Sequence, residues 1–139
     1  MKAALLTQLQ ARGALAAPVV VARALPPSIG GFYEYIGIAG PIQNQQTPVS
    51  MAMGSGASYA EDYTATVYID VQHPGTDAVT TENRAFALMA EIEQQLEDDP
   101  QVSGTVDIAE RNGYDAAARA DATVREYFIA MRIRCLAYI

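Results

Sequence analysis

Apolar and polar residues alternate along two segments of the chain, and a period of two is typical of half-buried strands. The first segment is 63–72, and the second runs from Val124 to about Tyr138. One face of each would point to the core. Those core positions are Tyr63, Ala65, Val67, Ile69 and Val71, followed by Tyr127, Ile129, Met131, Ile133 and Cys135.

Two other segments have the spacing of amphipathic helices. Residues 2–12 form a short helix that ends at Gly13, and a longer helix runs to about Asp98 with Thr80 or Thr81 as its cap. The longer helix has an apolar stripe that consists of Phe86, Met89, Ile92 and Leu96. We expect this stripe to pack against Val67, Ile69, Ile129, Met131 and Ile133.

The remaining segments complete the predicted order of elements. Residues 32–38 and 102–108 are further strand candidates, 19–21 is a short extended piece, and 111–123 is a loop or turn. The order is helix–strand–strand–helix–strand–strand. This predicts an α+β fold with a mostly antiparallel four-stranded sheet and two helices packed on one face. With 139 residues, the chain suits one domain over 1–139.

Residues 39–60 are polar and rich in small residues, and they predict a long loop. Loops of this length inside compact domains usually serve binding. The apolar residues of this segment could anchor it to a partner, since methionine adapts to irregular surfaces. They are Ile42, Val49, Met51 and Met53. The segment is therefore either a docking arm that becomes ordered on assembly or a solvated surface loop.

The outward positions of the two alternating strands form a second candidate interface. They include Tyr68, Phe128, Arg132 and Arg134. Aromatic residues and arginine are enriched at protein–protein interfaces. A polar face with scattered aromatic residues is also what an ordinary exposed sheet presents, and the sequence leaves both interpretations open.

Charge is distributed unevenly along the chain. Residues 1–60 contain three basic and one acidic residue, whereas 61–139 contain six arginines and fifteen acidic residues, giving net charges of +2 and −9. A protein that binds duplex DNA normally presents a basic surface that replaces phosphate counterions. We therefore expect no avid nucleic-acid binding. Solubility alone would also explain the acidity.

Candidate chemistry is scarce. His73 is the only histidine and precedes Pro74-Gly75, which predicts a solvated turn residue, and Cys135 lies on an apolar strand face, which predicts a buried, inert thiol. Residues 54–56 match neither a phosphate-binding loop nor a nucleophile elbow. We predict no catalytic, cofactor or metal site and no enzymatic activity. No segment approaches the roughly 20 apolar residues of a membrane span, so we expect no membrane association.

The order and texture of these elements resemble one known family. An Ala/Leu-rich opening helix leads to 19–27 (VVVARALPP), a strand ends in Ile36-Gly37-Ile38, and a polar loop precedes 63–71 (YTATVYIDV), an amphipathic helix and an Arg-bearing last strand. Over nearly the whole chain this resembles the tail terminator, or tail completion, proteins of long-tailed bacteriophages. The Met/Gly/Ser-rich stretch 50–58 has no counterpart in that pattern.

The resemblance implies a structural virion protein, made in the host cytoplasm, that forms a homomeric ring, usually a hexamer. Such a ring stops polymerisation of the tail tube and presents a surface for head joining. Its partners would be further copies of itself, the major tail tube protein and a head-proximal connector. DNA would pass through without specific binding, and the acid-rich second half would suit that role.

Two alternatives remain. One is another head–tail neck component, such as a head-closure protein, an adaptor or a tube subunit. The other, from a different class, is a small α+β ligand-binding domain or enzyme, which a cavity with convergent polar groups would favour.

Overall fold

The computed structural model describes residues 1–23, 33–50, 58–75, 77–120 and 124–138. For 39–50, 58–60, 120 and 138 it describes the backbone alone. The α+β class and the placement of two helices on one face of a sheet are confirmed.

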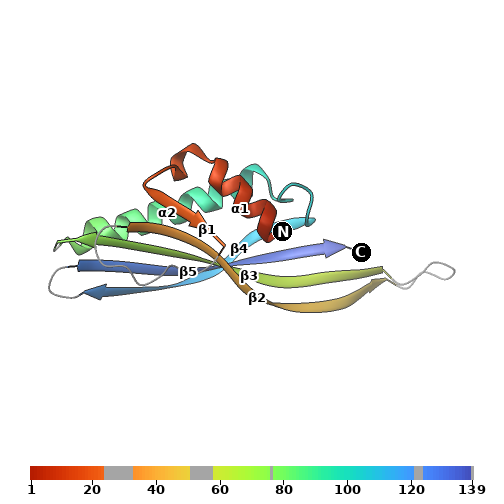
Figure 1. Cartoon of the computed structure of the whole chain (residues 1–139). Coiled ribbons are helices and arrows are strands. Elements are labelled where there is room, and N and C mark those ends of the chain that lie inside the picture. Colours follow the sequence, from red (N-terminus) through yellow and green to blue (C-terminus); the bar gives the residue numbers. More distant parts are fainter. Residues whose placement is uncertain (24–32, 51–57, 76, 121–123, 139) are drawn as a thin grey trace.

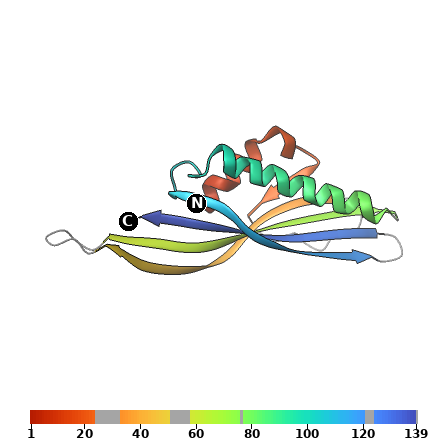
Figure 2. The same ribbon diagram turned by 180° about the vertical axis from the view of Figure 1, so that it is seen from behind.

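The sheet has five strands, in the order β1-β2-β3-β5-β4, and both helices lie on the same side of it (Figure 1, Figure 2). All neighbouring strands are antiparallel except β1, which is parallel to β2. The elements in chain order are α1 Lys2–Ala11, a 3₁₀ turn η1 Gly13–Leu15, β1 Val19–Ala22, β2 Tyr33–Ser50, β3 Ser58–Pro74, α2 Ala78–Asp98, β4 Ile108–Ala120 and β5 Val124–Tyr138. The predicted four-stranded sheet therefore lacked one strand. The short 19–21 piece pairs with β2 and extends the sheet by β1.

Helix α2 and strands β3 and β5 supply most of the core, and α1, β1 and β2 add to it. Met89, Ile92 and Leu96 are buried together with the core face of β3 and β5, as the stripe predicted. Phe86 is only partly buried, and its ring contacts those of Tyr114 and Tyr127. The buried apolar residues of β3 and β5 are Ala65, Val67, Ile69, Val71, Ile129, Met131, Ile133 and Cys135.

The cap of α2 is one turn earlier than the sequence pattern indicated. Asp77 is the N-cap, and its Oδ1 accepts the backbone N–H of Thr80 at 3.1 Å. Thr81 instead lies inside the first turn, where its hydroxyl donates to the Asp77 carbonyl at 3.1 Å. A carboxylate at the N-cap satisfies an otherwise free helical donor and has a favourable interaction with the helix dipole. Hydrogen bonding from Thr80 correspondingly lowers the pKa of Asp77.

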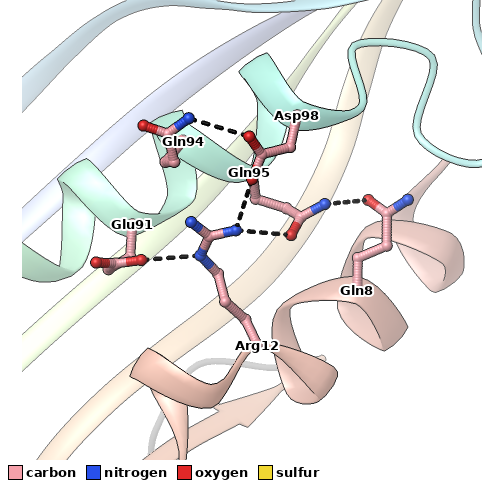
Figure 3. Close-up of polar contacts among 6 residues, drawn as sticks. All are labelled: Gln8, Arg12, Glu91, Gln94, Gln95 and Asp98. Carbon is pink, nitrogen blue, oxygen red and sulfur yellow. Dashed lines mark hydrogen bonds and ion pairs between the residues drawn. The ribbon is translucent and has the colours of Figure 1, made fainter.

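Helix α1 is held against α2 by one arginine and a set of amides (Figure 3). The Nε of Arg12 donates to Glu91 at 2.8 Å, and its Nη1 donates to Gln95 at 3.2 Å and to Asp98 at 3.0 Å. Gln8 of α1 donates to Asp99 at 2.6 Å, just beyond the end of α2. With Leu5 and Leu9 buried beneath, these contacts fix the angle at which α1 covers the sheet.

The predicted loop over 39–60 is wrong for most of its length. Residues 39–50 belong to β2 and 58–60 to β3, and they pair as an antiparallel hairpin from Gln43↔Thr64 to Ser50↔Ser58. The polar composition gave no sign of these strands. A strand that extends beyond the core has no buried face, so its apolar and polar residues need not alternate. Pro41 lies at a register shift between Ala39 and Gln43, where a missing N–H breaks few ladder bonds. Residues 51–57 lie outside the described part of the chain.

The two assignments between α2 and β5 are also wrong. Residues 102–107 form turns, not a strand, and 108–120 form β4, not a loop. Val102, Ser103 and Gly104 all have positive φ, and the Asp99 carboxylate accepts the backbone N–H groups of Gln101 and Ser103. The alternating apolar residues that suggested a strand are explained by burial of Val102 and Val106 within this turn.

We expect Ile92→Ala to lower the free energy of unfolding by about 2–5 kcal/mol, because the side chain is fully buried at the centre of the α2–sheet contact. Urea denaturation followed by circular dichroism measures this loss. Asn83→Ala, at an exposed position of the same helix, is the matched control and should change stability by less than about 0.5 kcal/mol. A loss for Ile92→Ala as small as that of the control would show that α2 does not rest on the sheet.

Candidate functional site: the uncovered face, the sheet edges and the distal hairpin

One face of the sheet is covered by no described helix (Figure 1, Figure 2). The side chains that alternate with the buried core positions project from it. Among the predicted interface residues, Tyr68 and Phe128 stack there with ring centroids 5.5 Å apart and an interplanar angle of 31°. They come from neighbouring strands β3 and β5, so the sequence prediction that both face outward is confirmed.

Arg132 and Arg134 lie on the same face, and both are engaged within the chain. Arg134 forms a forked pair with Asp62, with Nε at 3.1 Å from Oδ1 and Nη2 at 2.7 Å from Oδ2. Arg132 pairs with Asp115 of β4 and lies over the bulge at Gly113, where an added Cβ would meet its guanidinium at 3.0 Å. The φ of +88° at Gly113 also favours glycine. These pairs are partly exposed and contribute little stability, so they order the face more than they stabilise it.

The unexpected feature of this face is a buried carboxylate. Asp70 is only 5% exposed although it lies on the side away from the helices. Its cross-strand neighbours are Tyr35 on β2 and Phe128 on β5, and these aromatic residues flank it. The Tyr33 hydroxyl donates to Asp70 Oδ2 at 2.6 Å. Gln72, two residues on, is 8% exposed and lies opposite Glu126.

This polar group changes the ionisation of its members. Burial raises the pKa of Asp70, while the hydrogen bond from Tyr33 and the charge of Arg119 oppose the rise. Burial also raises the pKa of Glu126, and the charge of Asp70 adds to this effect. The pKa of Tyr33 is raised by burial and by its bond to Asp70. The sequence pattern placed Asp70 and Glu126 simply among outward polar residues, and the only available signal was an acid in mid-strand between Ile69 and Val71.

The two edges of the sheet differ in length. The outer edge of β4 has no strand partner among the described residues, and its positions 110–119 are exposed throughout. At the opposite edge, β1 pairs only with residues 34–37 of β2. From Ile38 onward the outer edge of β2 is unpaired within the described chain. Free backbone donors and acceptors on such edges are able to pair with another chain.

Beyond the core, β2 and β3 continue as a hairpin that runs past the helices, and the tip of this hairpin extends past the end of β5 (Figure 1). We call residues 46–50 and 58–61 the distal hairpin. β5 ends at the Tyr138↔Ala60 pair. Beyond it, Pro48 pairs with Tyr59 and Ser50 pairs with Ser58, and no third described strand lies beside these two pairs. Two of the predicted anchors, Met51 and Met53, lie outside the described residues. Ile42 and Val49 lie in β2, where the backbone alone is described.

A groove of about 450 Å³ lies between the second half of α2 and the start of β4. Its floor includes Leu96 and Ala109, which belong to the core, and its rim carries the Arg111–Glu93 ion pair at 2.7 Å. Glu97 and Glu110 also line the groove, so its charged groups are three carboxylates and one arginine.

The single histidine and the single cysteine both lie within strands of the sheet. His73 is in β3, 17% exposed, with Nε2 3.4 Å from Glu34 Oε1, so the prediction of a solvated turn residue was wrong. Arg84 also pairs with Glu34 at 2.8 Å on the helix-covered face. Cys135 is fully buried, as predicted, and burial raises the pKa of its thiol to about 11.

Within the described ranges, no group of three or more His, Cys, Asp or Glu side chains is arranged to hold a metal ion. None of the described helices combines the length and apolar character that a membrane span requires.

Comparison with known proteins finds similar solved structures but no matching sequence family. No family model matches the chain, and no curated protein matches it. A similar chain occurs in a solved structure described as "Virion of native gene transfer agent (GTA) particle". The two chains are 19% identical, the match covers 99% of this chain and 95% of that one, and the TM-score is 0.48.

We predict that Cys135 is unreactive in the folded protein. At pH 8 its thiol is both buried and almost entirely protonated, since its pKa is about 11. A thiol-specific chromogenic reagent should therefore titrate close to zero thiols per native chain and one thiol per chain in 6 M guanidinium. Rapid modification of the native protein would contradict the burial of this strand face.

Proposed function

We propose that this chain is a structural virion protein that forms a ring at the head-proximal end of a phage tail tube, where it stops tube polymerisation and provides the surface for head joining. The observation that carries the proposal is the distal hairpin, which extends the sheet beyond its own hydrophobic core. A strand pair with no core beneath it contributes little to the stability of the subunit. Its length is better explained by contacts outside the subunit.

The sheet edges support assembly with further copies. Three successive antiparallel pairings connect β2 to β3, β3 to β5 and β5 to β4. Strands β2 and β4 therefore run in opposite directions. When copies are related by rotation about a ring axis, β4 of one copy can meet the free β2 edge of the next in antiparallel orientation. Such head-to-tail contacts use two different surfaces and close into a ring at a fixed rotation. Six copies, as in the family that the sequence resembles, is the expected number.

The placement of charge is consistent with a conduit for DNA. The net charge of −7 would repel a passing duplex, and Arg132 and Arg134 on the uncovered face are already paired with carboxylates. In this proposal DNA passes without specific binding, while the tail tube protein and a head-proximal connector bind opposite sides of the ring.

The test removes the distal hairpin without disturbing the core. Gln45 and Asp62 are direct cross-strand partners, so 46–61 can be replaced by Asn-Gly, which favours a two-residue hairpin turn. This variant keeps Asp62 for its pair with Arg134. We expect an unchanged thermal midpoint within about 5 °C but loss of capping, seen by electron microscopy as overlong tubes when the variant is mixed with polymerising tail tube subunits.

The matched control replaces only 51–57 by Asn-Gly, since Ser50 and Ser58 are also paired. Native mass spectrometry reports ring formation for each form. A wild-type protein that stays monomeric at high concentration and leaves tube length unchanged would reject the proposed function. If the hairpin-shortened variant still forms rings and still caps tubes, the hairpin is not the contact, and the uncovered face around Phe128 and Arg132 becomes the leading interface.

A further inference from the structure

The strand register brings two carboxyl groups together on the uncovered face. Asp70 pairs with Phe128 and Gln72 pairs with Glu126, so Asp70 and Glu126 are diagonal neighbours on adjacent strands. Diagonal side chains on one face of an antiparallel pair are within reach of each other when they are long. Two ionised carboxylates in a site shielded from water repel strongly, and one of them is normally protonated.

The environment of Asp70 indicates how this conflict is resolved. Its Oδ2 accepts the Tyr33 hydroxyl, whereas its Oδ1 is buried and has no hydrogen-bond partner among the described residues. A buried carboxylate oxygen without a donor is costly. A protonated carboxyl beside it would remove the repulsion and supply a donor.

We propose that Asp70 and Glu126 share one proton in the folded protein at pH values where ordinary carboxyl groups are ionised, which makes the uncovered face of the sheet a pH-responsive surface. Glu126 carries the proton, and Asp70 is the acceptor. Asp70 is the better anion because it also accepts the Tyr33 hydroxyl. Loss of the shared proton at higher pH places two negative charges in one site and loosens the contact between β3 and β5 at this point.

The charged groups around the pair agree with this assignment. Among the described residues, Tyr33 and Tyr35 face it from β2 and Arg119 faces it from β4 opposite Glu126. The Arg132–Asp115 pair lies farther along the same face. The helices and the His73–Glu34–Arg84 group are on the other side of the sheet. One arginine can offset one of the two carboxylates, so a second negative charge is left without a partner.

The sign of the effect on stability follows from the raised pKa values. A carboxyl whose pKa is higher in the folded than in the unfolded chain stabilises the fold. This stabilisation is fully present when the pH is below the pKa of the unfolded chain, which is near 4. That contribution is lost as pH rises through the folded value. Removing one of the two carboxyls removes this pH-dependent loss. The stability of the variant relative to the wild-type protein should therefore be higher at pH 8 than at pH 4.

The decisive measurement is a ¹³C NMR titration of side-chain carboxyls in the intact wild-type protein, with Glu126→Gln and Asp70→Asn used to assign the two resonances. We expect one carboxyl of the pair to titrate well above the ordinary 3.9–4.3. In Asp70→Asn the Glu126 midpoint should fall by about one pH unit or more, because the neighbouring charge is gone. Ordinary midpoints for both groups in the wild-type protein would overturn the proposal.

Urea unfolding between pH 4 and pH 8.5 provides the second readout. The midpoint difference between Glu126→Gln and wild type should increase with pH. Glu97→Gln, an exposed carboxyl on α2, is the control and should follow the wild-type profile. Parallel profiles for Glu126→Gln and wild type would count against a shared proton, even if the variant is less stable at every pH.

Discussion

The packing of α2 across β3 and β5 is the contact on which the rest of the molecule depends. The buried residues Leu88, Met89, Ile92 and Leu96 of this helix cover strand residues that are fully buried. Isolated strand pairs are marginally stable in water, so the sheet needs this helix to exist. The register that results also fixes what lies on the opposite face, because a shift of one residue would exchange the two faces.

The opposite face follows from that constraint. Once Ile69, Val71 and Ile129 point to α2, Asp70 and Phe128 must point away from it. The aromatic residues that join them there bury a carboxylate with no helix above it. The uncovered face therefore has a buried polar group of its own, in which the pKa values of Asp70 and Glu126 are raised.

Long strands serve two separate purposes in this chain. The half of the sheet beneath the helices holds the fold together, whereas the distal hairpin and the free edges of β2 and β4 carry backbone groups beyond the core. A subunit with this division can present large surfaces to neighbours without changing its own packing. The proposed ring uses the edges between copies and the hairpin toward the tube.

The sequence by itself determined the elements that bury a face. The period of two in 63–72 and 124–138 and the apolar stripe of α2 follow directly from burial, so their positions and partners were predictable. Residues 43–50 and 108–120 form strands because a neighbouring strand satisfies their backbone groups, and no side-chain alternation records this. The same holds for the turn at Val102 to Gly104, where Asp99 supplies the acceptors. The meeting of Asp70, Glu126 and Tyr33 was decided only by the tertiary structure, because three strands far apart in the chain must first adopt one register.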